Sequence, residues 1–222
     1  RQSSVRKWAG FEISYETLGL QLAGVLMDGM RGVDDRSVTV FNPFVQRMAL
    51  IFPQGKGRAR VYFGNRAEEG FRPQGGKDVP RFIEECIKTG SPAEFYEGAE
   101  AAGPLATFPG IYDWVEHPYK DGVALVGDAA TTSDQTWGQG LSLTLGAVRR
   151  LRDALVSNDD WRQAGDNFAS AMRAMWEPIR TVEHWFTEIF MGASPEANAA
   201  RMKALPLIAQ DQDRIHDAFM SG

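Results

Sequence analysis

The hydrophobic positions divide the chain into an early region of strand-like runs and a later region of helical runs. The early runs, at 37–41, 47–52 and 58–63, are short, rich in β-branched and aromatic residues, and separated by Pro and Gly. The segment 53–57 is typical of a hairpin loop. Consecutive strands joined by short loops predict an antiparallel sheet within residues 11–70.

Shorter elements follow the strands. A helix is predicted at 78–89, ending at Gly90, because its apolar residues share one face and include Cys86. The run Ser91-Pro92-Ala93-Glu94 has the residue types of a capping box and predicts a second, short helix. A further strand is expected at 111–117.

The last third of the chain has helical periodicity. Apolar residues recur every three or four positions from about 159 to 191 and predict one long helix, which Pro178 should kink or split. We interpret this stripe as core rather than as a cofactor contact; it comprises Trp161, Ala164, Phe168, Met172, Met175, Ile179, Val182, Phe186 and Ile189. Ser194-Pro195-Glu196 opens another helix by the capping logic.

The stretch 123–151 departs from these simple patterns. An apolar run at 123–126 predicts a buried strand that ends at Gly127-Asp128, and a polar loop then leads to Gly138-Gln139-Gly140 and an amphipathic helix. This order places a carboxylate at a strand end and free backbone N–H groups at a helix start. Such a helix start, opened by glycines, favours a ligand that carries negative charge.

These residues resemble the second FAD-binding motif of flavoprotein monooxygenases of the para-hydroxybenzoate hydroxylase type. Gly127-Asp128-Ala129-Ala130, the seven-residue spacer, Gly138-Gln139-Gly140 and Leu151 stand as in that family. Four positions differ, because the family's usual His, Pro, Asn and Asp are replaced by Thr131, Gln135, Ser142 and Ala147. The resemblance implies FAD as the cofactor and NAD(P)H as its reductant.

The resemblance also implies roles for the motif. Asp128, flanked by Gly127 and Ala129, would accept a hydrogen bond from a ribityl hydroxyl of FAD. The turn Gly138-Gln139-Gly140, with Leu141, would face the pyrimidine edge of the flavin. The flavin itself would carry out the oxygen chemistry on a small organic substrate, aromatic or polycyclic, so no residue is assigned a catalytic role.

The first residues carry a second resemblance. Arg1, Ser3, Val5 and Arg6 are similar to the segment that follows an Asp-Gly pair in the middle of the same family. We therefore expect a piece of a longer protein, with the segment that bears the GxGxxG fingerprint upstream as its partner. Arg1 and Arg6 are candidates for contact with the cofactor phosphates, since guanidinium groups suit phosphate.

Substrate contacts are expected from the sheet and from the motif loop. By family analogy the sheet roofs the cavity above the flavin, and the candidate substrate residues are Phe41, Arg47, Phe52, Tyr62 and Trp137. Alternate strand residues face opposite sides, so only one of Tyr62 and Phe63 can face a ligand. Arg47 is the charge expected to steer an acidic substrate, and Trp137 either walls the cavity or packs beneath the loop.

The expected fold is mixed, α+β and α/β. It combines an antiparallel substrate-domain sheet, part of an FAD-binding Rossmann-like sheet and long C-terminal helices. The expected segments are 1–10, the end of a cofactor-domain segment; 11–120, the substrate sheet; 121–157, the second FAD motif; and 158–222, a helical region.

Composition narrows the function classes. The 222 residues carry a net charge of −5, which gives no basic footprint for nucleic acid. No apolar run approaches the roughly 18 residues of a membrane span. One cysteine excludes an internal disulfide and fits the cytoplasm, and the three histidines are too far apart in sequence to suggest a metal site.

Several alternatives stay open. A cofactor-free small-molecule binding module could keep the same scaffold, and flavin-dependent halogenases and prenyl reductases have similar second motifs. Hydroxylation, epoxidation and Baeyer–Villiger reactions are not distinguished, nor are NADH and NADPH. Association into a homo-oligomer is also open.

Overall fold

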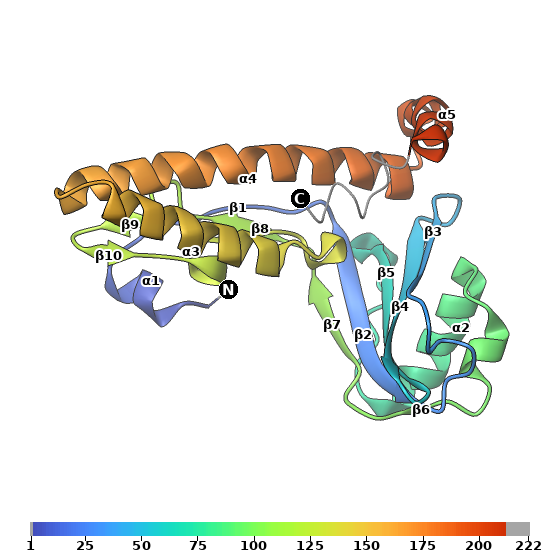
Figure 1. Ribbon diagram of the computed structural model, residues 1–222. Helices are drawn as coiled ribbons and strands as arrows, with labels where there is room; N and C mark the ends of the chain where they lie inside the picture. The colour runs from blue at the N-terminus through green and yellow to red at the C-terminus, as the bar shows by residue number, and fades with distance from the viewer. Residues whose placement is uncertain (1, 212–222) are drawn as a thin grey trace. The chain divides into compact units, whose positions relative to one another are not determined.

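The computed structural model describes residues 2–211, which fold into two compact units (Figure 1). The first, the motif unit, takes residues up to Leu18, then Ile111–Trp185, and resumes at Leu207. The second, the sheet unit, takes Gly19–Gly110 and Phe186–Pro206. Together they have the mixed α/β character expected from the sequence.

The sheet unit is built on a six-stranded antiparallel sheet of order β3-β4-β5-β2-β6, with β7 also paired to β2. Its strands are β2 (Leu20–Asp28), β3 (Val38–Asn42), β4 (Arg47–Gly55), β5 (Arg58–Arg66), β6 (Glu100–Ala101) and β7 (Ala106–Pro109). The three predicted strands are confirmed. The loop between β4 and β5 is tighter than predicted, because Lys56 and Gly57 both take positive φ, as two-residue hairpin turns require.

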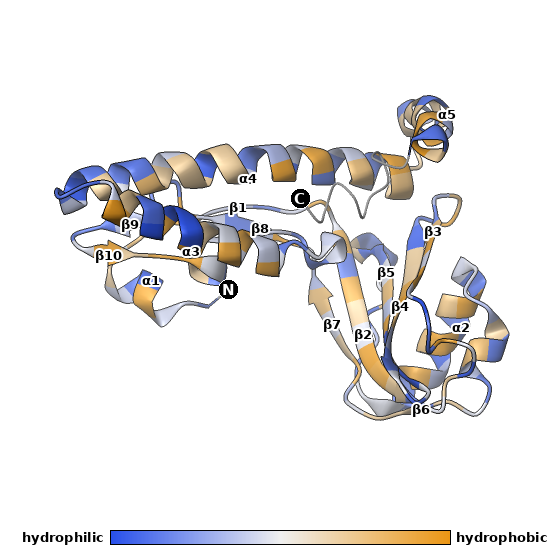
Figure 2. Ribbon diagram, viewed as in Figure 1, coloured by the Kyte–Doolittle hydropathy of each residue, from blue (hydrophilic) through white to orange (hydrophobic). Residues whose placement is uncertain are grey.

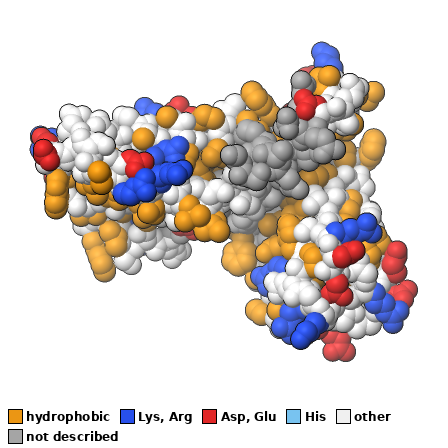
Figure 3. Space-filling model, viewed as in Figure 1, with side chains coloured by type: hydrophobic (Ala, Val, Ile, Leu, Met, Phe, Trp, Pro, Cys, Tyr) orange, Lys and Arg blue, Asp and Glu red, His pale blue; other side chains and the backbone are white. Residues whose placement is uncertain are grey.

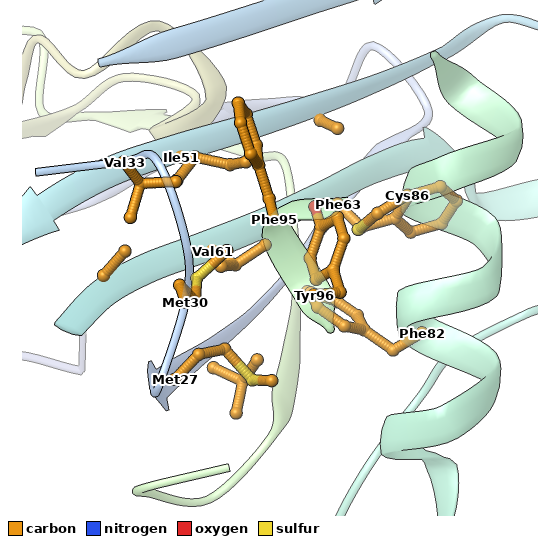
Figure 4. Close-up of a cluster of buried hydrophobic side chains, with 14 of the residues drawn as sticks. Met27, Met30, Val33, Ile51, Val61, Phe63, Phe82, Cys86, Phe95 and Tyr96 are labelled. Atoms are coloured by element: carbon orange, nitrogen blue, oxygen red, sulfur yellow. The ribbon is translucent and has the colours of Figure 1, made fainter. Parts of the chain in front are cut away.

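One face of this sheet packs on α2 (Val79–Thr89), and the strand register decides which residues lie there. Phe63 pairs with Ala49 and Ala23 and contacts Phe82 of α2, forming the core drawn in Figure 4. Cys86 is fully buried in the same core, and burial raises the pKa of its thiol to about 12. Cys86 thus packs with the apolar face of the predicted helix, and its protonated thiol is unreactive.

The predicted capping box at Ser91 is wrong. Residues Ala93–Tyr96 form a short 3₁₀ helix whose N-cap is Pro92, and no side chain caps it. The Ser91 hydroxyl instead lies 2.9 Å from the Tyr96 hydroxyl. The Ser91 hydroxyl therefore bonds to the buried Tyr96 hydroxyl and not to a backbone N–H group at the start of the helix.

The motif unit contains two small antiparallel sheets, of order β1-β8-β11 and β10-β9. Its strands are β1 (Ser14–Glu16), β8 (Tyr112–Trp114), β9 (Tyr119–Lys120), β10 (Val123–Ala124) and β11 (Thr131–Thr132), joined by α1 (Ser4–Trp8) and α3 (Gly140–Val156). Because β1 pairs with β8, residues 11–18 belong to this unit, and the sheet unit is narrower than the expected 11–120. The predicted buried strand at 123–126 is also corrected, since β10 is only two residues long and only Leu125 of the run is buried.

The C-terminal helices are α4 (Trp161–Met191) and α5 (Pro195–Gln210). Helix α4 continues through Pro178, so the predicted split does not occur. The α5 cap is confirmed, because Oγ of Ser194 accepts from the N–H of Ala197 at 3.0 Å. Along α4 the stripe is core at Phe168 and Met172, whereas Trp161 is exposed.

Hydrophobic residues concentrate along strands such as β2, while the helices mix hydrophobic and hydrophilic positions (Figure 2). Within residues 2–211, no helix joins the length and the apolar character that crossing a bilayer demands.

Candidate functional site

The segment Gly127–Ala129 forms a single 3₁₀ turn, named here the GDA turn. Gly127 has a φ of +57°, which disfavours any side chain. A Cβ atom at this position would also lie 3.0 Å from Oγ1 of Thr144, in α3. Glycine therefore lets the GDA turn lie directly against the first turns of α3.

The loop before α3 is shaped by Asp134 and Gly138. The Asp134 carboxylate accepts from the N–H of Thr136 at 2.9 Å and caps the 3₁₀ helix Gln135–Trp137. Gly138 then takes a φ of +73° and turns the chain into α3, which begins at Gly140. Gln139 holds the N-cap position, and its carbonyl accepts from the N–H of Leu143 at 2.9 Å.

The start of α3 offers backbone donors to a ligand. The N–H groups of Gly140, Leu141 and Ser142 have no acceptor within the part of the chain that the structure describes. This is the usual state of a helix N-terminus, where the positive end of the helix dipole adds to the donors. An electron-rich ligand edge is the chemistry that such a site suits.

The GDA turn and the start of α3 share one cavity. An open cavity of about 250 Å³ is lined by Asp128, Thr132, Ser133, Gln135, Gly138 and Gly140. The exposed Asp128 thus lies on the same cavity as the glycines that open the helix. Leu141 is 71% exposed but does not line the cavity, and Gln139 is buried.

Arg6 supports the GDA turn from within the fold. Its Nη1 atom lies 3.5 Å from the carbonyl oxygen of Ala129 and 3.6 Å from Oδ1 of Asp113, and its side chain is only 10% exposed. Asp113 in turn donates its backbone N–H to Oγ1 of Thr132, which lines the cavity. The structure therefore gives Arg6 a buried carboxylate partner, whereas Arg1 lies outside the described residues.

Phe41, Phe52 and Tyr62 share one face of the sheet, the face opposite to α2. Leu50 pairs with Tyr62, Met48 pairs with both Phe41 and Gly64, and Phe63 points to the α2 side. The sequence argument that Tyr62 and Phe63 must face opposite ways is thus borne out by the register.

Of the other two substrate candidates, Arg47 pairs with carboxylates and Trp137 takes the packed position that the sequence left open. Arg47 lies on the α2 face, where its guanidinium bridges the carboxylates of Glu85 and Glu69, so it is not a free charge on the face of Tyr62. The Glu69 contact is 3.0 Å long. Trp137 is 2% exposed, so its indole packs inside the fold and does not wall an open cavity.

The sequence analysis did not identify one buried acidic group, Glu183. Glu183 of α4 is fully buried, and burial raises its pKa to about 8, helped by the charge of Asp134 and opposed by the nearby Tyr112 hydroxyl. Burial likewise raises the pKa of the Tyr112 hydroxyl, with the charge of Glu183 adding to the effect. The buried face of α4 includes Met172, Trp176, Glu183 and Thr187. Val182, which the predicted core stripe included in place of Glu183, is only half-buried.

Two of the three comparisons with known proteins find matches. No family model matches the sequence. Among curated proteins, digeranylgeranylglycerophospholipid reductase 1 of Methanopyrus kandleri is 29% identical over 133 residues, which are 58% of this chain and 33% of that protein.

Solved structures match over nearly the whole chain. HpxO of Klebsiella pneumoniae, complexed with FAD and uric acid, has a TM-score of 0.75 at 15% identity, covering 99% of this chain and 58% of that one. The OxyS anhydrotetracycline hydroxylase of Streptomyces rimosus has a TM-score of 0.72 at 16% identity, covering 99% and 44%. The tetracycline destructase Tet(55) has a TM-score of 0.66 at 18% identity, covering 96% and 58%. The chain has the fold of the corresponding parts of these proteins and spans about half of their length.

Proposed function

We propose that this chain forms the flavin-ring half of the FAD site and the substrate-binding sheet of an FAD-dependent monooxygenase. The observation that carries the proposal is the cavity that Asp128 shares with the start of α3. A carboxylate and a helix N-terminus on one cavity match the two polar parts of a flavin, its sugar-alcohol chain and its electron-rich pyrimidine edge.

Each group has a distinct task in this proposal. The Asp128 carboxylate would accept a hydrogen bond from a ribityl hydroxyl. The N–H groups of Gly140, Leu141 and Ser142 would donate to the pyrimidine edge and favour negative charge there. A bound flavin reduced by NAD(P)H would supply the oxygen chemistry, and the chain's own residues would bind, orient and exclude water.

We also propose that more of the same protein completes the site. The GxGxxG fingerprint, which would bind the ADP half of FAD, does not occur in these 222 residues. Helix α3 exposes an apolar stripe of Leu141, Leu145 and Val148, and hydrophobic side chains gather over α3 in Figure 3. A stripe of this kind is suited to cover by a further segment of protein.

A reductase is the second candidate. The curated relative found by sequence is a reductase, and a flavin-dependent brominase, Bmp2, shares the fold with a TM-score of 0.66. Oxygen separates the reductase from the main proposal, because a monooxygenase consumes O₂ with its substrate and a reductase does not. A brominase also consumes O₂, so a requirement for bromide would separate it. A cytoplasmic location and association of identical chains stay predictions.

The test is the visible spectrum of the natural protein that contains this chain. We expect it to purify with bound flavin and to lose that flavin in Asp128→Ala. The control is Asp121→Asn, an exposed turn residue with a φ of +49° that asparagine tolerates, and it should retain the flavin. A colourless protein that takes up no added FAD would contradict the proposal and favour a cofactor-free binding module.

A further inference from the structure

The sheet face opposite to α2 carries the partly exposed ring of Tyr62 near its centre. A Cβ atom on Gly24 would lie 2.7 and 2.8 Å from Cδ1 and Cε1 of Tyr62, its cross-strand partner. The Tyr62 ring therefore extends sideways over the bare backbone of Gly24, which a side chain there would prevent. Tyr62 is only half-buried, so part of its ring is open to a ligand.

Two neighbours lie beside this ring. Phe52 meets the Tyr62 ring edge to face, with the ring centroids 6.0 Å apart, and is 41% exposed. The guanidinium carbon of Arg60 lies 5.6 Å from the centroid of the Tyr62 ring. Arg60 lies opposite Phe52 on β4 and opposite Leu26 on β2, so its direct cross-strand neighbours are apolar.

Within the described residues the Arg60 side chain makes no hydrogen bond or ion pair, unlike the side chains of Arg58 and Arg66 on the same strand. Nε and Nη2 of Arg58 donate to the Asp28 carboxylate at 2.6 and 2.8 Å, and Arg66 donates to Gln46 and to the carbonyl of Met191. Within residues 2–211, Arg60 contacts no carboxylate, and its guanidinium makes a cation–π contact with the Tyr62 ring. A half-buried cation beside two aromatic rings is complementary to a flat anion.

We propose that Arg60, Tyr62 and Phe52 form a subsite for planar aromatic anions, and that Arg60 selects for the negative charge. The ring of the ligand stacks on Tyr62 against the edge of Phe52. Its carboxylate or phenolate receives the planar fork of Arg60, which suits a two-oxygen acceptor. Arg60 takes the role that the sequence had suggested for Arg47. The inference rests on the proposed function only in naming this ligand as the substrate.

The probes are 2-naphthoate and its neutral analogue 2-naphthamide, titrated by calorimetry into the natural protein that contains this chain. We expect naphthoate to bind at least about tenfold more tightly, a factor that corresponds to 1.4 kcal/mol. Arg60→Met, which keeps the apolar stem, should abolish this preference and leave naphthamide binding unchanged. Arg60→Lys should restore part of it, because the charge returns without the fork.

Arg58→Met is the matched control. Arg58 lies on the same strand and the same face as Arg60, but its charge is already paired with Asp28. The variant should preserve the preference for naphthoate. Tyr62→Leu should weaken both probes and keep their ratio, since it removes the stacking surface but not the charge.

Equal affinity for the two probes in the unmodified protein, or no binding of either at millimolar concentration, would overturn the inference. Loss of the preference in Arg58→Met would do the same. Because neither titration depends on bound flavin, a colourless protein that prefers naphthoate would contradict the proposed function and leave the subsite standing.

Discussion

A Cβ atom on Gly127 would lie 3.0 Å from Oγ1 and 3.2 Å from Cγ2 of Thr144. This close approach brings the GDA turn against α3 and sets the spacing between Asp128 and the helix start. The Thr144 hydroxyl is itself held, since it donates to the carbonyl of Gly140 at 2.8 Å. The turn and the helix therefore fit each other only when residue 127 has no side chain.

Replacing Gly127 with alanine should destabilise the fold and weaken FAD binding. The backbone conformation alone costs about 1–2 kcal/mol for a residue with a Cβ atom, and contact with Thr144 adds to that cost. Gly122→Ala is the control, because Gly122 has a φ of +82° with no atom within 4 Å of its Cβ position. Urea unfolding should show a larger loss for Gly127→Ala, and the added change Thr144→Ala should recover part of the difference. Equal losses in the two single variants would contradict the crowding argument.

Glu183 should make stability fall as the pH rises. Its pKa in the folded chain is about 8, above the ordinary value of 4.5, so the fold favours the protonated carboxyl. The stability it contributes is complete below pH 4.5 and is lost as the pH rises through 8, by up to about 1.4 kcal/mol per pH unit. Glu183→Gln, which keeps the shape without the charge, should match the unmodified protein at pH 5 and exceed its stability at pH 8.5.

The measurement is urea unfolding at both pH values, with Glu177→Gln as the control. Glu177 is an exposed residue of the same helix, so its replacement should leave the pH dependence unchanged. An unaltered pH dependence in Glu183→Gln would show that another group is responsible.

Local patterns sufficed for much of this fold. The period-two alternation of a strand correctly placed Tyr62 and Phe63 on opposite faces, and Ser194 caps its helix because a cap needs only neighbouring residues. The GDA turn and the glycines at the start of α3 meet on one cavity because the chain between them is short.

Charged residues were harder to place, because their partners come from distant parts of the chain. The strand pattern around Arg47 could not show that Glu85 of α2 pairs with it in a part-buried ion pair. The buried stripe of α4 passes through Glu183, with Val182 half-buried, and one residue of drift along a long helix cannot be resolved from its periodicity. Arg6 reaches Ala129 across 123 residues of sequence, a contact that depends on how the whole motif unit folds.

The Arg6–Asp113 pair should be worth more to the motif unit than a surface ion pair. Both side chains are about one-tenth exposed, at 10% and 11%. Removing one partner of a buried pair leaves an uncompensated charge, and Arg6→Met should cost about 3 kcal/mol in urea unfolding. The same change frees the carbonyl of Ala129, so FAD should also bind less tightly. The added change Asp113→Asn should recover part of the stability, because it removes the stranded charge.

Arg173→Met provides the comparison. Arg173 pairs with Glu116 at 3.2 Å, but both side chains are more than half exposed, so the loss should be about 0–1 kcal/mol. A loss for Arg6→Met as small as that for Arg173→Met would show that water already screens the Arg6 pair. Recovery of flavin binding along with stability in the double variant would mean that Arg6 acts by neutralising Asp113. Recovery of stability alone would mean that its hydrogen bond to Ala129 holds the GDA turn in position for FAD.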